Sequence, residues 1–131
     1  MDNIVTGLSG TARMIVGTND TAPRVGSGKI AVLATPVMIN LIEEAALNAI
    51  EGALGEGQQS LGTHLDVSHI AATPTGMEVV ATASVTAVDG RRVEFSVKVE
   101  DEIELVGEGT HTRVVVTAEK FQSRVDAKAG S

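Results

Sequence analysis

The chain has 131 residues, of which 43% are hydrophobic and 21% charged, and this composition excludes intrinsic disorder and predicts a single packed domain over residues 1–131. Its formal net charge of −7 at pH 7 has the wrong sign for neutralising phosphates along a nucleic acid, so we expect no nucleic-acid partner. Cysteine is absent, which excludes disulfides and thiolate catalysis, and the apolar runs fall far short of the roughly 20 residues of a membrane helix.

The N-terminal quarter of the sequence has weak periodicity. Its first ten residues lack the basic and long apolar stretches of a signal peptide, so we expect a cytoplasmic protein with flexible ends at residues 1–10 and 125–131. Residues 11–17 predict a short strand. Residues 18–28 are rich in turn formers and predict a mobile loop.

The strongest helix signal starts at Thr35, which fits the N-cap position, and Pro36 fits the first helical position. The pattern continues to about Leu54, with apolar residues around most of the circumference, and it therefore predicts a largely enclosed helix. Glu43 and Glu44 lie in its middle. Such a carboxylate is either a solvated surface residue or, when its solvation is reduced, a general base or nucleophile.

After residue 60 the hydrophobic period changes to two and predicts strands at 61–70, 76–88, 92–100 and 110–118. Together with the helix, these strands predict an α+β fold in which an antiparallel sheet has one face covered by the helix. A sheet of this size with one helix leaves apolar area exposed, so we also expect a homodimer.

Two details of strand register follow from the same alternation. Between the second and third of these strands we predict a three-residue loop, residues 88–90, that pairs Val85 with Val93. In the glycine-rich segment 107–109 we predict a bulge, after which the apolar row continues at Val114 and Val116.

His69 ends an apolar row of alternating residues that also contains Leu61, Thr63, Leu65 and Val67. A partly desolvated imidazole there could act as a general acid or base, but a core histidine bonded to a backbone carbonyl has the same pattern. His64 falls on the polar row and should face solvent.

The histidines do not predict a metal site. His64 and His69 are five residues apart, so on a strand they face opposite sides and cannot share an ion. His111 and Arg113 share a face, but no carboxylate accompanies them at a defensible spacing. We therefore expect no bound metal.

Five segments, taken together in order and spacing, resemble the fluoroacetyl-CoA thioesterase family. They are ATP at 34–36 with Glu43 eight residues after Thr35, SLGTHLDVSHIAATPTG at 60–76, VDGRRVEF at 88–95, GEGTHTRVVV at 107–116 and EKF at 119–121. The resemblance implies a hotdog fold, a homodimer with active sites at the subunit interface, and hydrolysis of an acyl-CoA thioester. It places the catalytic positions on Thr35, Glu43 and His69, with Gly62 and Arg113 lining the site.

These residue types suit thioester chemistry, which needs a nucleophile or activated water, a proton shuttle and donors near the carbonyl oxygen. In this scheme Glu43 attacks or activates water, His69 transfers a proton, Thr35 donates or relays one, and the N–H near Gly62 contacts the thioester oxygen. No cofactor is expected, because coenzyme A is part of the substrate. The candidates for binding its phosphates are Arg91, Arg92, Arg113, Lys120 and Arg124.

The segment before Thr35 bears on the acyl group. Fluoroacetyl-specific members of the family have aromatic residues there, whereas residues 25–29 contain none. We therefore predict a short-chain acyl group other than fluoroacetyl. Two other interpretations stay open: a hotdog protein that binds acyl-CoA without hydrolysing it, and a purely structural dimerisation module.

Overall fold

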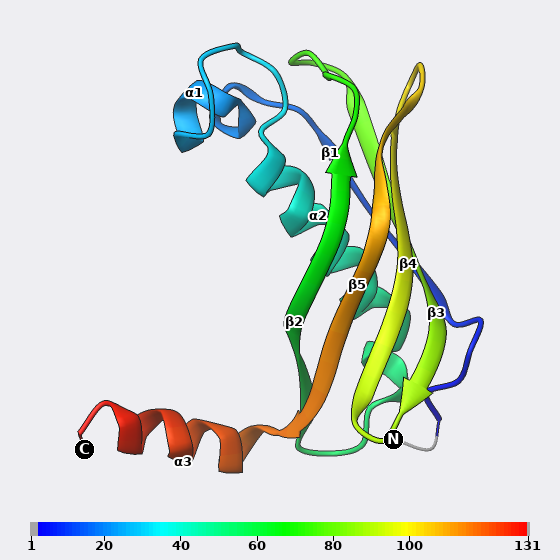
Figure 1. Cartoon of the computed structure of the whole chain (residues 1–131), viewed down its shortest axis with the longest axis vertical. Helices are drawn as coiled ribbons and strands as arrows, with labels where there is room; N and C mark the ends of the chain where they lie inside the picture. Colours follow the sequence, from blue (N-terminus) through cyan, green and yellow to red (C-terminus); the bar gives the residue numbers. More distant parts are fainter. Residues whose placement is uncertain (1–2, 131) are drawn as a thin grey trace.

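The computed structural model describes residues 3–130 and consists of a five-stranded antiparallel sheet with one long helix along one face (Figure 1). Its elements are β1 (Ser9–Ile15), α1 (Ala22–Val25), α2 (Thr35–Ile50), β2 (Gln58–His69), β3 (Glu78–Asp89), β4 (Arg92–Asp101), β5 (Leu105–Thr117) and α3 (Ala118–Lys128). The strand order β1-β3-β4-β5-β2 leaves β1 and β2 as the two edges. The predicted α+β class, with a helix-covered antiparallel sheet, is confirmed.

The hydrophobic core fills the space between α2 and the sheet. The predicted apolar rows of β3 and β4 are buried, and they comprise Val79, Ala81, Ala83, Val85, Val93, Phe95, Val97 and Val99. On the edge strand β1, Gly10 lies against the helix: a Cβ there would overlap the main chain of Ala45 and Ala49. A residue without a side chain at this position therefore lets β1 pack directly on α2.

The segment between β1 and α2, predicted as a mobile loop without regular structure, contains two short helical turns. It contains a 3-10 helix at Thr18–Asp20 and the single turn of α1. The long helix ends at Ile50, earlier than predicted, because the chain tightens into a 3-10 turn at Glu51–Ala53.

The predicted loop between β3 and β4 is wrong. Asp89 pairs with Arg92, so the turn has only two residues and begins at Gly90, whose φ is 61°. Val85 pairs with Phe95 rather than Val93, because an extra residue, Thr86, is accommodated as a bulge inside β3. The bulge keeps apolar residues on one face without needing the longer loop.

Two further bulges change which residues of β2 and β5 face the helix. In β2 the pairing to β5 shifts between Gly62 and His64, so Leu61 does not share the face of His69 as predicted. In β5 the bulge lies at Val106, which has no partner on β4, just before residues 107–109, where the bulge was predicted. The buried row of β5 then runs through His111, Arg113 and Val115, whereas Val114 and Val116, predicted to continue the apolar row, are only partly buried on the other face.

The ends of the chain hold more structure than the predicted flexible segments. Ile4 is buried in the core and β1 begins at Ser9, while α3 occupies residues 118–128; residues 1, 2 and 131 lie outside the described part. None of the residues of α3 is buried, and Figure 1 shows it running from the base of β5 past the edge strand β2. Among residues 3–130, no helix is long and apolar enough to cross a membrane.

Candidate active site

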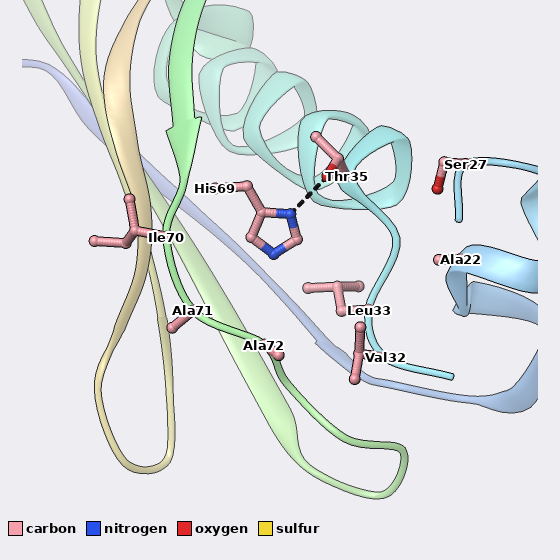
Figure 2. Close-up of a pocket in the computed structure, with 9 residues that line it drawn as sticks. All are labelled: Ala22, Ser27, Val32, Leu33, Thr35, His69, Ile70, Ala71 and Ala72. Carbon is pink, nitrogen blue, oxygen red and sulfur yellow. Dashed lines mark hydrogen bonds between the residues drawn. The ribbon is translucent and has the colours of Figure 1, made fainter. Parts of the chain in front are cut away.

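A pocket of about 280 Å³ opens where α1, the start of α2 and the end of β2 meet (Figure 2). It is lined by Ala22, Ser27, Val32, Leu33, Thr35, His69, Ile70, Ala71 and Ala72. Six of the nine lining residues have aliphatic side chains and three have polar ones, while polar and apolar atoms contribute similar amounts of its surface. A concave site that combines aliphatic side chains with a few convergent polar groups is typical of small-molecule binding.

Two of the predicted site residues meet in this pocket. The Thr35 Oγ1 and His69 Nδ1 atoms lie 2.7 Å apart, although the residues are 34 positions apart in the sequence (Figure 2). The prediction that Thr35 is the N-cap of α2 is wrong, because Ala34 occupies that position and Thr35 is the first helical residue. Its hydroxyl is therefore available for the imidazole.

The environment of His69 favours the neutral imidazole. Burial lowers the pKa of His69, and the main chain of Ala71 opposes this shift only in part. The buried Nε2 atom has no hydrogen-bond partner of good geometry within residues 3–130, and in Figure 2 it lies on the side of the ring away from Thr35. A neutral imidazole with one unpartnered nitrogen can still accept or deliver a proton there.

Glu43 belongs to a second cluster within the same chain. Its Oε2 accepts a hydrogen bond from Arg113 Nη1 at 3.1 Å, and Arg113 also donates to the side chain and carbonyl oxygens of Ser60 at 2.8 and 3.1 Å. Glu43 lies eight residues after Thr35, about 12 Å along the axis of α2. Within one chain, Thr35 and His69 are thus brought together, whereas Glu43 is grouped with Arg113.

His111 completes the second cluster and was not predicted as a site residue. Its Nδ1 lies 2.8 Å from the His64 carbonyl oxygen, and because a carbonyl can only accept, Nδ1 carries the proton. Its Nε2 is then free to accept from Arg113 Nη1 at 3.2 Å. Burial, together with the Arg113 cation, lowers the pKa of His111, despite opposing effects of the His64 carbonyl and Glu43.

The sequence offered no carboxylate for His111 and Arg113 at a defensible spacing, and the structure shows that α2 supplies one, Glu43, from the opposite layer. No periodicity within β5 could reveal this contact. Within residues 3–130, no three His, Asp or Glu side chains are grouped so that they could hold a metal ion.

Gly62 borders this second cluster. A Cβ at this position would overlap Glu43 Oε2 and would lie 3.1 Å from His111 Cε1 and 3.3 Å from Arg113 Nη1. The absence of a side chain at position 62 therefore leaves room for the carboxylate beside the guanidinium. The predicted site residues Gly62, Glu43 and Arg113 are neighbours in the structure.

Comparisons with known proteins agree on one family. Residues 16–119 match the family described as FlK, fluoroacetyl-CoA-specific thioesterase. The chain is 42% identical over 97 residues to the fluoroacetyl-CoA thioesterase of Streptantibioticus cattleyicolor, covering 74% of this chain and 70% of that protein.

Solved structures are similar to this chain over almost its whole length. A structure of the fluoroacetyl-CoA thioesterase FlK matches with a TM-score of 0.90 and 34% identity, over 95% of this chain and 97% of that one. A hot-dog-like protein from Thermanaerovibrio acidaminovorans matches with a TM-score of 0.90 and 26% identity, over 99% of this chain and 96% of that one. The hotdog fold implied by the sequence resemblance is confirmed.

Proposed function

Because the chain belongs to the family of fluoroacetyl-CoA-specific thioesterases, we propose that this thioesterase hydrolyses a short-chain acyl-CoA to the free acid and coenzyme A, with Thr35, Glu43 and His69 as the catalytic group. The observation that carries this assignment is the 2.7 Å contact between Thr35 Oγ1 and His69 Nδ1 in a pocket whose other side chains are mainly aliphatic. Both residues occupy positions at which the family resemblance places catalytic groups.

The proposed chemistry uses the two clusters for different steps. Glu43 takes a proton from a water that adds to the thioester carbonyl carbon, or attacks that carbon itself and forms an anhydride, which a water then hydrolyses to the free acid. In both routes the carbon–sulfur bond breaks and coenzyme A leaves as a thiolate. The thiolate takes the proton on Nε2 of His69, and the proton released by the hydrolytic water restores the neutral imidazole. Thr35 orients the imidazole through Nδ1 and relays its proton.

The pocket supports a small, uncharged acyl group. Its lining near His69 consists of small and medium aliphatic residues, and its volume is about 280 Å³. Residues 25–29, which precede the threonine, contain no aromatic side chain. We therefore favour short aliphatic acyl groups over fluoroacetyl.

In this scheme the Glu43 that acts with Thr35 and His69 belongs to a second copy of the chain. The strand β2 is a free edge of the sheet, and two such edges can pair antiparallel about a twofold axis. His69 ends β2, and Gly62, beside Glu43, lies nearer its start, so antiparallel pairing brings the His69 of one protomer toward the partner's Gly62 region. We propose that each active site combines Thr35 and His69 of one protomer with Glu43 of its partner.

The first test is hydrolysis of a panel of acyl-CoA esters of increasing chain length, followed as release of free thiol. We expect turnover to be highest with short acyl groups and to fall about a hundredfold or more in His69→Ala and Glu43→Gln. His64→Ala is the matched control, because that imidazole is exposed on the same strand. Unaltered turnover in His69→Ala and Glu43→Gln would contradict the catalytic assignment.

The second test asks whether the site is shared between protomers. His69→Ala and Glu43→Gln chains with different affinity tags are co-expressed, and the mixed species is purified through both tags. If the site is shared, one of the two sites in the mixed dimer has both native residues, and we expect about half of the wild-type activity per dimer. Activity no higher than that of either variant alone would contradict a shared site.

Binding without hydrolysis is the alternative, and the separation of Glu43 from Thr35 and His69 within one chain is the observation that favours it. Titration of coenzyme A by calorimetry distinguishes the two functions. Binding of coenzyme A together with no thiol release from any ester would support the alternative.

A further inference from the structure

The imidazole of His111 is fully buried, yet the proposed chemistry gives it no step. It lies on the buried face of β5, two residues before Arg113, and its ring stacks on Phe95 with the ring centroids 5.9 Å apart and 26° between the planes. A buried polar ring costs stability unless its nitrogens are hydrogen-bonded, and an apolar side chain could fill the same space without that cost. The partners of the two nitrogens therefore indicate what the histidine does.

These partners fix the protonation of the ring. Nδ1 lies 2.8 Å from the His64 carbonyl oxygen, which can only accept, so Nδ1 carries the proton. Nε2 lies 3.2 Å from Nη1 of Arg113, which can only donate, so Nε2 carries none. A flip of the ring would remove both bonds. The imidazole is therefore held as one neutral tautomer in one orientation.

The Nε2 bond connects His111 to Glu43. Nη1 of Arg113 donates to Nε2 of His111 at 3.2 Å and to Oε2 of Glu43 at 3.1 Å, so it lies between the imidazole and the carboxylate. The other guanidinium nitrogens donate to the side chain and carbonyl oxygens of Ser60. All three nitrogens of the guanidinium are thus bound, and His111 supplies the acceptor that holds the edge facing Glu43.

The Nδ1 bond connects His111 to the bulge in β2. The pairing of β2 with β5 shifts between Gly62 and His64, which makes Thr63 the extra residue, and His111 binds the carbonyl at the far end of this bulge. The ring also borders the near end, because a Cβ on Gly62 would lie 3.1 Å from Cε1 of His111. A bulge interrupts the regular ladder, so a side-chain bond from the neighbouring strand restricts its conformation.

We propose that His111 is a positioning residue that sets the Glu43 carboxylate and the main chain of Gly62 relative to each other, an inference that rests on the proposed function. Glu43 is the proposed nucleophile or base, and the N–H near Gly62 is the expected contact to the thioester oxygen. They belong to α2 and β2 of the same protomer, and His111 bonds from β5 to the groups that hold both. The attacking group and the donor to the oxygen must keep one geometry, because small displacements lower the rate steeply.

Two amide variants separate the two bonds. His111→Asn places an amide nitrogen near the position of Nδ1, so it keeps the donor to His64 but is too short to reach Arg113. His111→Gln places an amide oxygen near the position of Nε2, so it keeps the acceptor for Arg113 but has no donor at the Nδ1 position. In the full-length protein we expect each variant to lower kcat about tenfold, with KM within about twofold of the wild type.

Ile50→Val is the matched control for lost stability. It deletes one buried methyl group from α2, the helix that also carries Glu43, and it touches neither bond of His111. We expect it to lower the urea midpoint and to leave kcat unchanged.

A cycle of double variants distinguishes positioning from a purely structural role. In Glu43→Gln the carboxylate that the Arg113 bond orients is gone, so adding His111→Asn should lower kcat by less than about twofold. Adding His111→Gln to Glu43→Gln should still lower kcat about tenfold, because this variant releases the bulge rather than the carboxylate. A general defect in packing would lower kcat by the same factor in both backgrounds.

The outcomes separate this inference from the proposed function. If the wild type hydrolyses an acyl-CoA and either amide variant has the wild-type kcat, the inference is overturned and the proposed function stands. A full tenfold loss on adding His111→Asn to Glu43→Gln would also overturn it. If the wild type released no thiol from any ester, the proposed function would be wrong, and the positioning role would be wrong with it.

Discussion

The guanidinium of Arg113 and the carboxylate of Glu43 lie 3.1 Å apart, from Nη1 to Oε2, and this contact joins β5 to the middle of α2. Arg113 is only 4% exposed, and its other donors are bound by Ser60. The guanidinium therefore holds the carboxylate in one orientation while satisfying the polar groups of β2. Arg113 is a positioning residue for Glu43, because it acts on the proposed nucleophile or base rather than on the reacting atoms.

Arg113→Lys should destabilise the protein although it keeps the charge. A lysine cannot reproduce the planar set of bonds to Glu43 and to both oxygens of Ser60, so buried acceptors are left unsatisfied. We expect the free energy of unfolding, measured in urea, to fall by about 2–3 kcal/mol. Arg13→Lys, at an exposed ion pair, is the control and should change it by less than about 0.5 kcal/mol. Equal losses in both variants would contradict the structural role of Arg113.

Gly62→Ala should reduce both activity and stability. The added Cβ overlaps the end of the Glu43 side chain, which must rotate away and leave the buried guanidinium of Arg113 without its counter-ion. We expect kcat to fall about tenfold or more and the free energy of unfolding to fall by about 1–3 kcal/mol. Gly52→Ala is the control, since a Cβ there meets nothing within 4 Å and its φ is not positive. If Gly62→Ala had the wild-type kcat, hydrolysis would not depend on the position of the Glu43 carboxylate, and the prediction would be wrong.

Alternation along single strands predicted the core well, because β3 and β4 each bury one face of a regular pleat. Val79, Ala81, Val97 and Val99 are buried as the pattern requires. The strand pairings that were predicted wrongly all lie at bulges. One extra residue there moves every later side chain of the strand to the opposite face of the sheet. At Thr63, for example, the bulge separates Leu61 from the face of His69, and residue identity alone does not reveal it.

The candidate site was only partly predictable, for a related reason. His111 and Arg113 are polar residues on the buried face of β5, although polar residues usually lie on the exposed face of a strand. Arg113 can be buried because it pairs with Glu43 of α2, and no pattern within β5 reveals this contact. Threonine has a high propensity for the N-cap position, but the hydroxyl of Thr35 is hydrogen-bonded to the imidazole of His69 instead. The helix α3 was not predicted because it buries no residue, so it lacks the apolar stripe by which helices are found in a sequence.

Stability should decrease in mild acid because of the buried imidazoles. The pKa values of His69 and His111 are lowered in the folded protein, so below about pH 6.5 the unfolded chain binds protons that the native state does not. The free energy of unfolding is therefore highest above pH 6.5, falls between pH 6.5 and the lowered pKa values, and these two groups cause no further loss below them. We expect a lower urea midpoint at pH 5.5 than at pH 7.5, and a smaller difference in His111→Gln. A midpoint that rises toward pH 5.5 would contradict these shifts.

The rate of hydrolysis should have an acid limb that belongs to His69. Because the pKa of His69 is lowered by burial, the imidazole stays neutral at pH 7 and becomes protonated only below pH 6.5. The logarithm of kcat/KM should then be flat near neutrality and decrease below pH 6.5. In His69→Ala the residual rate should show no such limb. A limb that persists unchanged in this variant would assign it to another group.

Thr35→Val tests the hydroxyl at nearly constant volume. Valine keeps the shape of threonine but cannot bond to Nδ1 of His69, and the imidazole loses the contact that fixes its orientation. We expect kcat to fall about tenfold or more, with a loss of about 1 kcal/mol in the free energy of unfolding. Thr35→Ser restores the hydroxyl without the methyl group and should recover most of the rate. If valine and serine gave the same kcat, the methyl group rather than the hydrogen bond would be the feature that matters, and the role of Thr35 as orienter and relay would be wrong.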